Sequence, residues 1–379
     1  MYLYQKNSEY FAQIANELIP NGKKELSWLG AKNIKEEYRG LRFKAEKEAL
    51  YKINYKSRLS TRILAPLSEF KCNSPNKLYS EGRRIQWDDF LTLDNTFAVF
   101  ANVSDSAINN SHFASLKLKD AIADFFVDKV GERPNVDARN PDLWINLYIR
   151  KDYAIISIDT SGGSLHKRGY REKSIDAPMQ ETLAAEIINL SEWDTEQPIY
   201  DPMCGSGTLL SEALMYCSNT PSGFLRKKFG FTALPDFDNT LWEAILEKGK
   251  RLIEKPEEGL ITGSDISKQA VYAARANLMN LPGGEAVKVF RSSFQDLEKI
   301  EGALIISNPP YGIRMNQEED LASFYKEFGD FLKNTCKNST AYIYFGERSY
   351  IKKIGLKASW KKPLKNGGLD GRLAKYELY

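Results

Sequence analysis

The hydrophobic and polar positions of the chain form two different patterns, one before and one after about residue 160. In the first part, some segments repeat apolar residues at helical spacing and others alternate apolar with polar residues. The two kinds of segment follow no regular order, which predicts an α+β module. Helices are predicted over 23–29, 45–64 and 117–130, and strands over 41–43, 97–103, 143–149 and 153–158.

In the second part of the chain, predicted strands and helices alternate regularly. Such alternation indicates a parallel sheet with helices on both faces, the Rossmann-like α/β arrangement. The small residues of 160–164 separate the two patterns, and we interpret them as a hinge and domain boundary. A hairpin pattern around 366–368 predicts an antiparallel edge on this sheet. Strands are predicted over 199–200, 260–263, 287–290, 304–307 and 341–345, and helices over 207–216, 268–279 and 321–337.

A glycine-containing loop, Asp201-Pro-Met-Cys-Gly-Ser-Gly-Thr208, joins the first of these strands to a helix. A dinucleotide fingerprint needs a third glycine where this chain has Leu210, and a P-loop lysine is missing. The acid that opens the loop would repel phosphates but attract an ammonium group. A ligand with an amino-acid end and a nucleoside end, such as S-adenosylmethionine, therefore fits better; the alternative is a tight turn without a ligand. The predicted cofactor contacts in this loop are Asp201, Met203, Cys204, Gly205 and Gly207.

Asp265 lies at the end of the next predicted strand. A carboxylate at this place can accept hydrogen bonds from both ribose hydroxyls of a nucleoside. The alternative is that it caps the helix that starts near Lys268, although Ser267 could also be the cap. We therefore predict a ribose contact for Asp265.

The strongest chemical pattern is the turn Asn308-Pro-Pro-Tyr311, which follows a buried strand. The prolines fix the direction of the main chain and remove two donors. The Asn308 side-chain oxygen and the Pro309 carbonyl remain as acceptors, and together they can hold both hydrogens of an exocyclic base amine. That geometry frees the nitrogen lone pair to attack a methyl group, while the ring of Tyr311 offers a face for stacking. We predict that Asn308, Pro309, Pro310 and Tyr311 form the catalytic turn, with Asn308 also next to the cofactor.

Composition narrows the class of protein mainly by exclusion. The 53 Lys and Arg residues almost balance the 50 Asp and Glu residues, so a nucleic-acid partner would need a local basic patch. The four cysteines and two histidines are not spaced like metal ligands, so we expect no metal site and no disulfide framework. No run approaches the roughly 20 apolar residues of a membrane span, and the N-terminus is unlike a signal peptide. A reduced, cytoplasmic protein is expected.

A local basic patch is predicted between residues 52 and 84, where basic residues outnumber acids and aromatic residues are interleaved. Neutralisation of phosphates with occasional base stacking is the chemistry such a segment offers to RNA. The alternative is a solvated helix face. The predicted RNA contacts are Lys52, Lys56, Arg58, Arg62, Arg83 and Arg84.

The pairing of the glycine loop with the Asn308–Gly312 turn resembles class I S-adenosylmethionine-dependent RNA methyltransferases that carry a THUMP domain. Segments 168–171 and 177–184 resemble that family's link into its catalytic domain. The likeness runs through the whole chain and extends to the bacterial large-subunit methyltransferase L group, which methylates guanine N2 in 23S rRNA. The resemblance implies a ferredoxin-like region over 1–60, a THUMP RNA-binding domain over 61–160 and a methyltransferase domain over 161–379.

Adenine recognition departs from the family's pattern. Where related enzymes often carry an acid after the third strand, this chain has Ser293, with Asp296 three residues later. We expect Ser293 to contact the adenine and Phe294 to flank its ring, with Asp296 as an alternative partner.

Two questions stay open at this stage. The amine could be N6 of adenine in RNA or DNA instead of guanine N2, and the chain could be an RNA-binding assembly factor without catalysis. The insert between Tyr216 and Leu260 carries Arg226-Lys-Lys228 beside two phenylalanines. It could border an RNA path or pack as a solvated helical hairpin.

Overall fold

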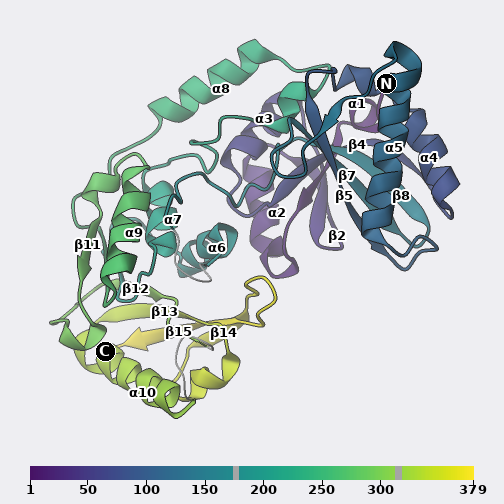
Figure 1. Cartoon of the computed structure of the whole chain (residues 1–379). Helices are drawn as coiled ribbons and strands as arrows, with labels where there is room; N and C mark the ends of the chain where they lie inside the picture. The colour runs from purple at the N-terminus through teal and green to yellow at the C-terminus, as the bar shows by residue number, and fades with distance from the viewer. Residues whose placement is uncertain (174–178, 312–317) are drawn as a thin grey trace. The chain divides into compact units, whose positions relative to one another are not determined.

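The computed structural model describes residues 1–173, 179–311 and 318–379 (Figure 1). The chain divides into two compact units. The first contains Met1–Leu165 and Arg226–Leu246, and the second contains His166–Leu225 and Glu247–Tyr379. The helix α8, Asn239–Arg251, therefore begins in one unit and ends in the other.

The first unit is built on an eight-stranded sheet with the order β2-β3-β1-β4-β8-β7-β5-β6. Its first four strands have the order of a ferredoxin-like fold, with β1 between β3 and β4. Strand β4 belongs to both halves of the sheet, because it pairs with β1 near its start and with β8 along the rest of its length. The boundary expected at residue 60 falls just before this shared strand. The strands are β1 Glu9–Gln13, β2 Lys32–Glu37, β3 Gly40–Lys44, β4 Arg62–Lys71, β5 Thr96–Ser104, β6 Asn135–Val136, β7 Leu143–Arg150 and β8 Tyr153–Asp159.

Two helices, α4 and α5, lie side by side over the second half of this sheet (Figure 1). The Asn110 side chain begins α5 by accepting a hydrogen bond from the Phe113 N–H at 2.9 Å, and Gly131 ends it with positive φ. Buried residues at helical spacing fix the face of α5 that packs on the sheet, as the pattern predicts. The helices of this unit are α1 Leu3–Asn7, α2 Ile19–Trp28, α3 Lys47–Lys56, α4 Pro75–Arg83 and α5 Ser111–Val130.

The helix predicted over 45–64 is too long. Helix α3 ends at Lys56, and residues from Arg62 onward form β4. The Glu25 carboxylate of α2 accepts hydrogen bonds from the Ser57 hydroxyl and the Arg58 N–H, both at 2.7 Å, and so holds the turn between them. The apolar residues of β4 happen to continue the helical spacing of α3. Periodicity alone therefore does not reveal where the helix ends.

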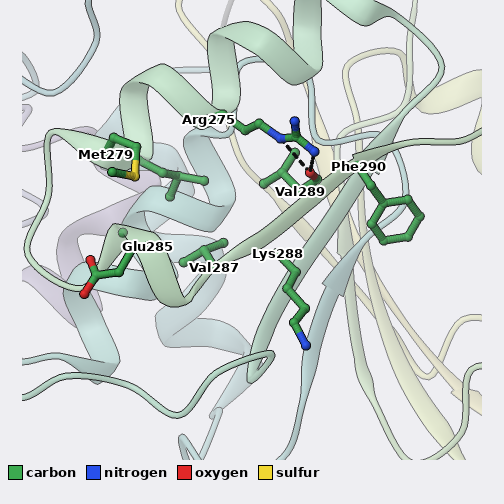
Figure 2. Close-up of a pocket in the computed structure, with 9 residues that line it drawn as sticks. Arg275, Met279, Glu285, Val287, Lys288, Val289 and Phe290 are labelled. Carbon is green, nitrogen blue, oxygen red and sulfur yellow. Dashed lines mark hydrogen bonds between the residues drawn. The ribbon is translucent and has the colours of Figure 1, made fainter.

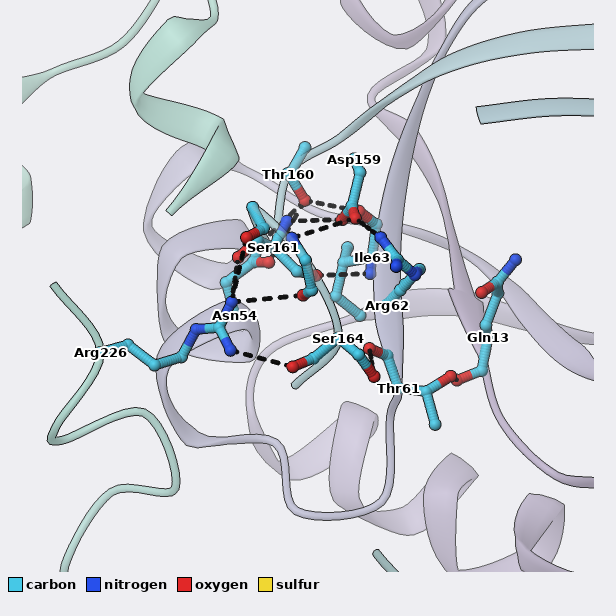
Figure 3. A network of polar contacts seen from close by, with 12 residues as sticks. Gln13, Asn54, Thr61, Arg62, Ile63, Asp159, Thr160, Ser161, Ser164 and Arg226 are labelled. Atoms are coloured by element: carbon cyan, nitrogen blue, oxygen red, sulfur yellow. Dashed lines mark hydrogen bonds and ion pairs between the residues drawn. The ribbon is translucent and has the colours of Figure 1, made fainter. Parts of the chain in front are cut away.

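The segment predicted as a hinge is a buried, hydrogen-bonded part of the first unit. Thr160 and Ser161 are fully buried, and Thr160 accepts a hydrogen bond from the Asn54 amide at 3.1 Å. Figure 3 shows the Arg226 guanidinium directed at this segment; it donates to the carbonyls of Ser161 and Ser164 at 2.8 and 3.0 Å. Small residues are needed here because the chain is closely packed, so the hinge interpretation was wrong. The change of unit follows at Leu165.

Residues 226–246 of the insert belong to the first unit. Phe229 and Phe231 are buried, and their rings stack 5.3 Å apart beside Trp242 and Tyr51. Lys228 forms an ion pair with Asp142 at 2.8 Å. Residues 226–246 of the insert therefore contribute to the core of the first unit and do not form a solvated hairpin. That the insert borders an RNA path stays a prediction.

The second unit contains the Rossmann-like sheet. Its seven described strands have the order β11-β10-β9-β12-β13-β15-β14. The first five are parallel, and β14 and β15 form the antiparallel edge that the hairpin pattern predicts. The strands are β9 Ile199–Asp201, β10 Ile261–Asp265, β11 Lys288–Arg291, β12 Leu304–Ser307, β13 Ser339–Phe345, β14 Trp360–Pro363 and β15 Arg372–Leu378.

Helices cover both faces of this sheet (Figure 1). Helix α10 buries aromatic residues against strands β12 and β13, and α7 lies against α6, α9 and β10. The predicted α/β class is confirmed. Among the helices of the described ranges, none is long and apolar enough to cross a membrane. The helices are α6 Glu181–Ser191, α7 Thr208–Cys217, α9 Lys268–Met279 and α10 Glu318–Thr335.

Candidate active site

The glycine loop runs from the carboxyl end of β9 into α7. Gly205 and Gly207 both have positive φ, +55° and +80°, so each occupies the left-handed region that favours glycine. A Cβ on Gly207 would lie 3.1 Å from the Cβ of Ala274 in α9, so a side chain would also crowd that helix. The sequence places glycine where both conformation and space require it.

Asp265, at the carboxyl end of β10, braces this loop. Its Oδ2 accepts a hydrogen bond from the Gly205 N–H at 2.9 Å, and its Oδ1 accepts one from the Ser267 N–H at 2.9 Å. Each carboxylate oxygen can accept a further bond, so these contacts leave capacity for two ribose hydroxyls. The Ser267 hydroxyl accepts a hydrogen bond from the Ala270 N–H and so caps α9. Ser267, and not Asp265, is therefore the capping residue.

Ile266 was not singled out from the sequence. Its side chain is 65% exposed although it follows a buried strand directly. An exposed apolar side chain next to Asp265 provides a surface for a flat apolar ring. The pattern that could have revealed it is an isoleucine directly after the acid that ends β10.

Asp201 is buried at the end of β9, with 2% of its surface exposed. Its Oδ1 accepts hydrogen bonds from the Met203 N–H at 3.1 Å and from the Ser307 hydroxyl at 2.9 Å. Burial raises the pKa of this carboxyl to about 7, and the nearby charge of Asp265 adds to the rise. Asp201 thus joins the glycine loop to the end of β12. Its contact with an ammonium group stays a prediction.

The other residues predicted in the loop have clear positions. Met203 is partly buried and packs against the aromatic core beneath α10. Cys204 is 6% exposed, and burial raises the pKa of its thiol well above the usual range. A neutral, buried thiol fills space in this turn and is not poised as a nucleophile.

Asn308 lies at the carboxyl end of β12, next to Ser307. Its Oδ1 is buried and has no hydrogen-bond partner among the described residues. Leaving a buried acceptor unsatisfied costs about 1–3 kcal/mol, so native proteins rarely keep one without a reason. A ligand that donates a hydrogen bond at this point would supply the missing partner.

The rest of the turn is held by two aromatic contacts. The Tyr325 hydroxyl of α10 donates a hydrogen bond to the Pro310 carbonyl at 3.1 Å. The ring of Tyr311 lies so close to Gly346 that a Cβ there would come within 2.6 Å of it. The role of the Pro309 carbonyl as the second acceptor stays a prediction. Gly312, which ends the quoted motif, lies outside the described residues.

The predicted adenine contacts lie in the short helix η5, Phe294–Asp296, and at its cap. The Ser293 hydroxyl is bonded to Gln295 within this turn. Phe294 is 5% exposed and packs among rings of α10, with the centroid of Phe328 at 5.4 Å. The Phe294 side chain is directed into the core, and the Ser293 hydroxyl is bonded within its own turn. Both contacts with adenine therefore stay predictions.

Among the predicted RNA contacts, four basic residues are paired with acids. Three of them pair within or beside their own helix or strand: Lys52 with Glu48, Arg83 with Asp128 and Arg84 with Glu81. The fourth, Arg62, pairs with Asp159, and its guanidinium lies 4.2 Å from the centroid of Phe100. The Arg84 side chain is 71% exposed. Lys56 and Arg58 are half-buried at the end of α3.

A hollow of about 480 Å³ lies at the β11 edge of the sheet and contains none of the predicted site residues. Figure 2 shows Arg275 of α9 reaching the Val289 carbonyl, which its Nε contacts at 2.8 Å. The hollow is wide open and largely apolar, so it lacks the convergent polar groups of a catalytic site.

Residues 168–173 are anchored to two helices of the second unit. Arg168 forms a fully buried ion pair with Glu212 of α7, with Nε and Oε1 3.1 Å apart. Arg171 donates to the Thr208 hydroxyl at 3.1 Å, and Asn277 of α9 accepts from the Glu172 N–H at 3.0 Å. These contacts connect the segment to α7, the helix that follows the glycine loop, and to α9.

Comparison with known proteins identifies the family. The family described as RMKL-like, methyltransferase domain, matches residues 168–375. The chain belongs to this methyltransferase family. A THUMP domain matches 72–159, and the RlmL ferredoxin-like domain matches 12–64. The resemblance to THUMP-containing class I methyltransferases is thereby confirmed.

Relatives cover nearly the whole chain. A proposed RNA methyltransferase of Synechocystis sp., slr0064, is 38% identical over 98% of this chain and 97% of that protein. The ribosomal RNA large subunit methyltransferase K/L of Syntrophotalea carbinolica is 34% identical over 98% of this chain. The chain spans about half the length of that enzyme, 53%.

A solved relative is consistent with the expected cofactor. SMU.472, crystallised in complex with SAH, is 30% identical, with a TM-score of 0.85 over 98% of both chains. SAH is S-adenosylmethionine without its transferable methyl group. The chain is therefore an S-adenosylmethionine-dependent methyltransferase. The buried Asn308 oxygen, which lacks a partner in the part of the chain that the structure describes, fits that chemistry.

Proposed function

We propose that the chain methylates an exocyclic base amine of RNA, and that this amine is N2 of guanine in 23S ribosomal RNA. The observation that carries the amine is the buried Oδ1 of Asn308 at the carboxyl end of β12, for which the described part of the chain offers no hydrogen-bond partner. The RNA substrate is supported by the THUMP match and by relatives named as RNA methyltransferases. Guanine N2 and 23S rRNA rest on the likeness to the large-subunit methyltransferase L group.

Residues at the carboxyl ends of β9 and β10 would hold the cofactor. Gly205 and Gly207 keep the loop free of side chains, and Asp265 has acceptor capacity for the ribose hydroxyls. Ile266 provides an exposed apolar face for the adenine ring. When bound, the cofactor supplies an electrophilic methyl group on a sulfonium.

The turn after β12 would hold the amine. Asn308 Oδ1 and the Pro309 carbonyl would each accept one amine hydrogen, so the nitrogen becomes more tetrahedral and its lone pair is less delocalised into the base. Most of the rate enhancement would come from orientation and from these fixed dipoles. The Tyr311 ring would stack on a base that has left its helix.

The test is transfer of tritiated methyl groups from S-adenosylmethionine to unmodified transcripts of 23S rRNA and 16S rRNA and to duplex DNA. We expect label in 23S rRNA, recovered as N2-methylguanosine after digestion to nucleosides. Label in N6-methyladenine would contradict the guanine assignment. No transfer by a chain that binds SAH in calorimetry would indicate an RNA-binding factor without catalysis.

The predicted RNA contacts give a second expectation. RNA affinity should fall as salt rises, because each neutralised phosphate releases counterions. For Arg84→Gln we expect the slope of log affinity against log salt to become shallower by about 0.7–0.9, the value of one phosphate contact. Filter binding to a 23S rRNA fragment between low and moderate salt measures this slope.

The matched control is Arg251→Gln, which removes a similarly exposed arginine, 72% exposed, that the sequence does not place in the basic patch. Its slope should equal that of the wild type. Equal slopes for Arg84→Gln and the wild type would show that Arg84 contacts no phosphate.

A further inference from the structure

The catalytic turn is held at both ends by side-chain hydroxyls. At its entrance, the Ser307 hydroxyl donates to Asp201 at 2.9 Å. At its exit, the Tyr325 hydroxyl donates to the Pro310 carbonyl at 3.1 Å. Pro309 and Pro310 have no N–H, so the middle of the turn has no main-chain donor that could fix it. Contacts from neighbouring elements help to define its position.

Tyr325 is unusually well placed for this purpose. Its ring is fully buried and stacks on Tyr350 at 4.8 Å with an interplanar angle of 10°. On another side it meets Phe345 of β13 at 5.6 Å. Burial raises the pKa of the phenol, so the hydroxyl keeps its proton and remains a donor. A clamped ring leaves the hydroxyl little freedom to point elsewhere.

We propose that Tyr325 is a positioning residue for methyl transfer: by holding the Pro310 carbonyl, it sets the place of the Asn308 and Pro309 oxygens that grip the amine. This rests on the proposed function. Tyr325 lies in α10, 14 residues beyond Tyr311, and no motif in the sequence marked it.

The size of the effect distinguishes positioning from packing. A single neutral hydrogen bond contributes little to folding, so its loss should leave the urea midpoint almost unchanged. A displacement of the turn by about 1 Å, in contrast, can lower a rate about 100-fold. Tyr325→Phe removes the hydroxyl and keeps the stacked ring, so it separates the two contributions.

The matched control is Tyr376→Phe. Tyr376 lies in the same hydrophobic cluster and is 1% exposed, but its hydroxyl has no hydrogen-bond partner among the described residues. Both variants delete one buried phenol oxygen. We expect Tyr325→Phe to lower kcat about 10- to 100-fold, with SAH affinity and urea midpoint close to wild type. Tyr376→Phe should keep the wild-type kcat.

Crystal structures of both variants supply a readout that does not need activity. The turn at 308–311 should shift in Tyr325→Phe and stay in place in Tyr376→Phe. An unmoved turn, or a wild-type kcat in Tyr325→Phe, would overturn the inference, as would a loss of kcat matched by equal losses of SAH affinity and stability. A wild-type protein that transfers no methyl group would instead refute the proposed function, and the crystal comparison would still decide the placement of the turn.

Discussion

Asn308→Ala is expected to lower kcat for methyl transfer about 100- to 1,000-fold, the usual cost of removing one preorganised group that acts on developing charge. The Asn308 oxygen would bond the amine most strongly as the nitrogen becomes tetrahedral, so its loss should affect the transition state more than substrate binding. SAH affinity, measured by calorimetry, should remain near that of the wild type because other residues hold the cofactor.

The stability of the Asn308→Ala variant provides a second, independent test of this prediction. Asn308 Oδ1 is buried and finds no hydrogen-bond partner within residues 1–173, 179–311 and 318–379, so we expect it to cost folding free energy in the absence of substrate. Asn308→Ala should therefore unfold at the same or a higher urea concentration than the wild type, while a merely structural asparagine would lose stability. Asn308→Asp is the matched variant, because it keeps an acceptor oxygen and should retain more activity than alanine. Wild-type turnover in Asn308→Ala would remove Asn308 from the mechanism.

The same residues show why much of the site could be predicted from the sequence. Gly205 lies in the loop after β9, Asp265 is the last residue of β10 and Asn308 directly follows β12. Parallel strands bring their carboxyl ends to one edge of a sheet. Local sequence thus fixes both the strand and the polar residue after it. The regular alternation of strands and helices predicts that these strands are parallel.

Contacts between distant segments were not predictable in this way. The bond between Ser307 and Asp201 joins residues 106 positions apart, and Glu25 ends α3 from another helix. The insert residues 226–246 join the first unit because their rings find a core there, which periodicity does not encode. The ion pairs of the basic patch were likewise not predictable, because Arg83 and Arg62 both pair with acids far along the chain.

The buried ion pair between Arg168 and Glu212 gives the largest expected effect on stability. Arg168→Met should lower the free energy of unfolding by about 3–5 kcal/mol, because it removes the positive charge that compensates a buried carboxylate. The two side chains are 1% and 0% exposed, and their second contact, from Nη2 to Oε2, is 3.4 Å long. Urea unfolding followed by circular dichroism would measure the change.

The double variant Arg168→Met with Glu212→Leu decides whether the charge or the packing is responsible. Removing both charges replaces a desolvated pair with apolar contacts, which is often neutral or stabilising, so most of the lost stability should return. Additive losses would instead assign the effect to the shape of the two side chains.

Glu285→Gln provides the exposed comparison in the same unit: its pair with Lys255, at 3.0 Å, is open to solvent, and its loss should leave the unfolding midpoint unchanged. Because Glu212 lies in the helix that the glycine loop begins, Arg168→Met should also weaken SAH binding, whereas Glu285→Gln should not.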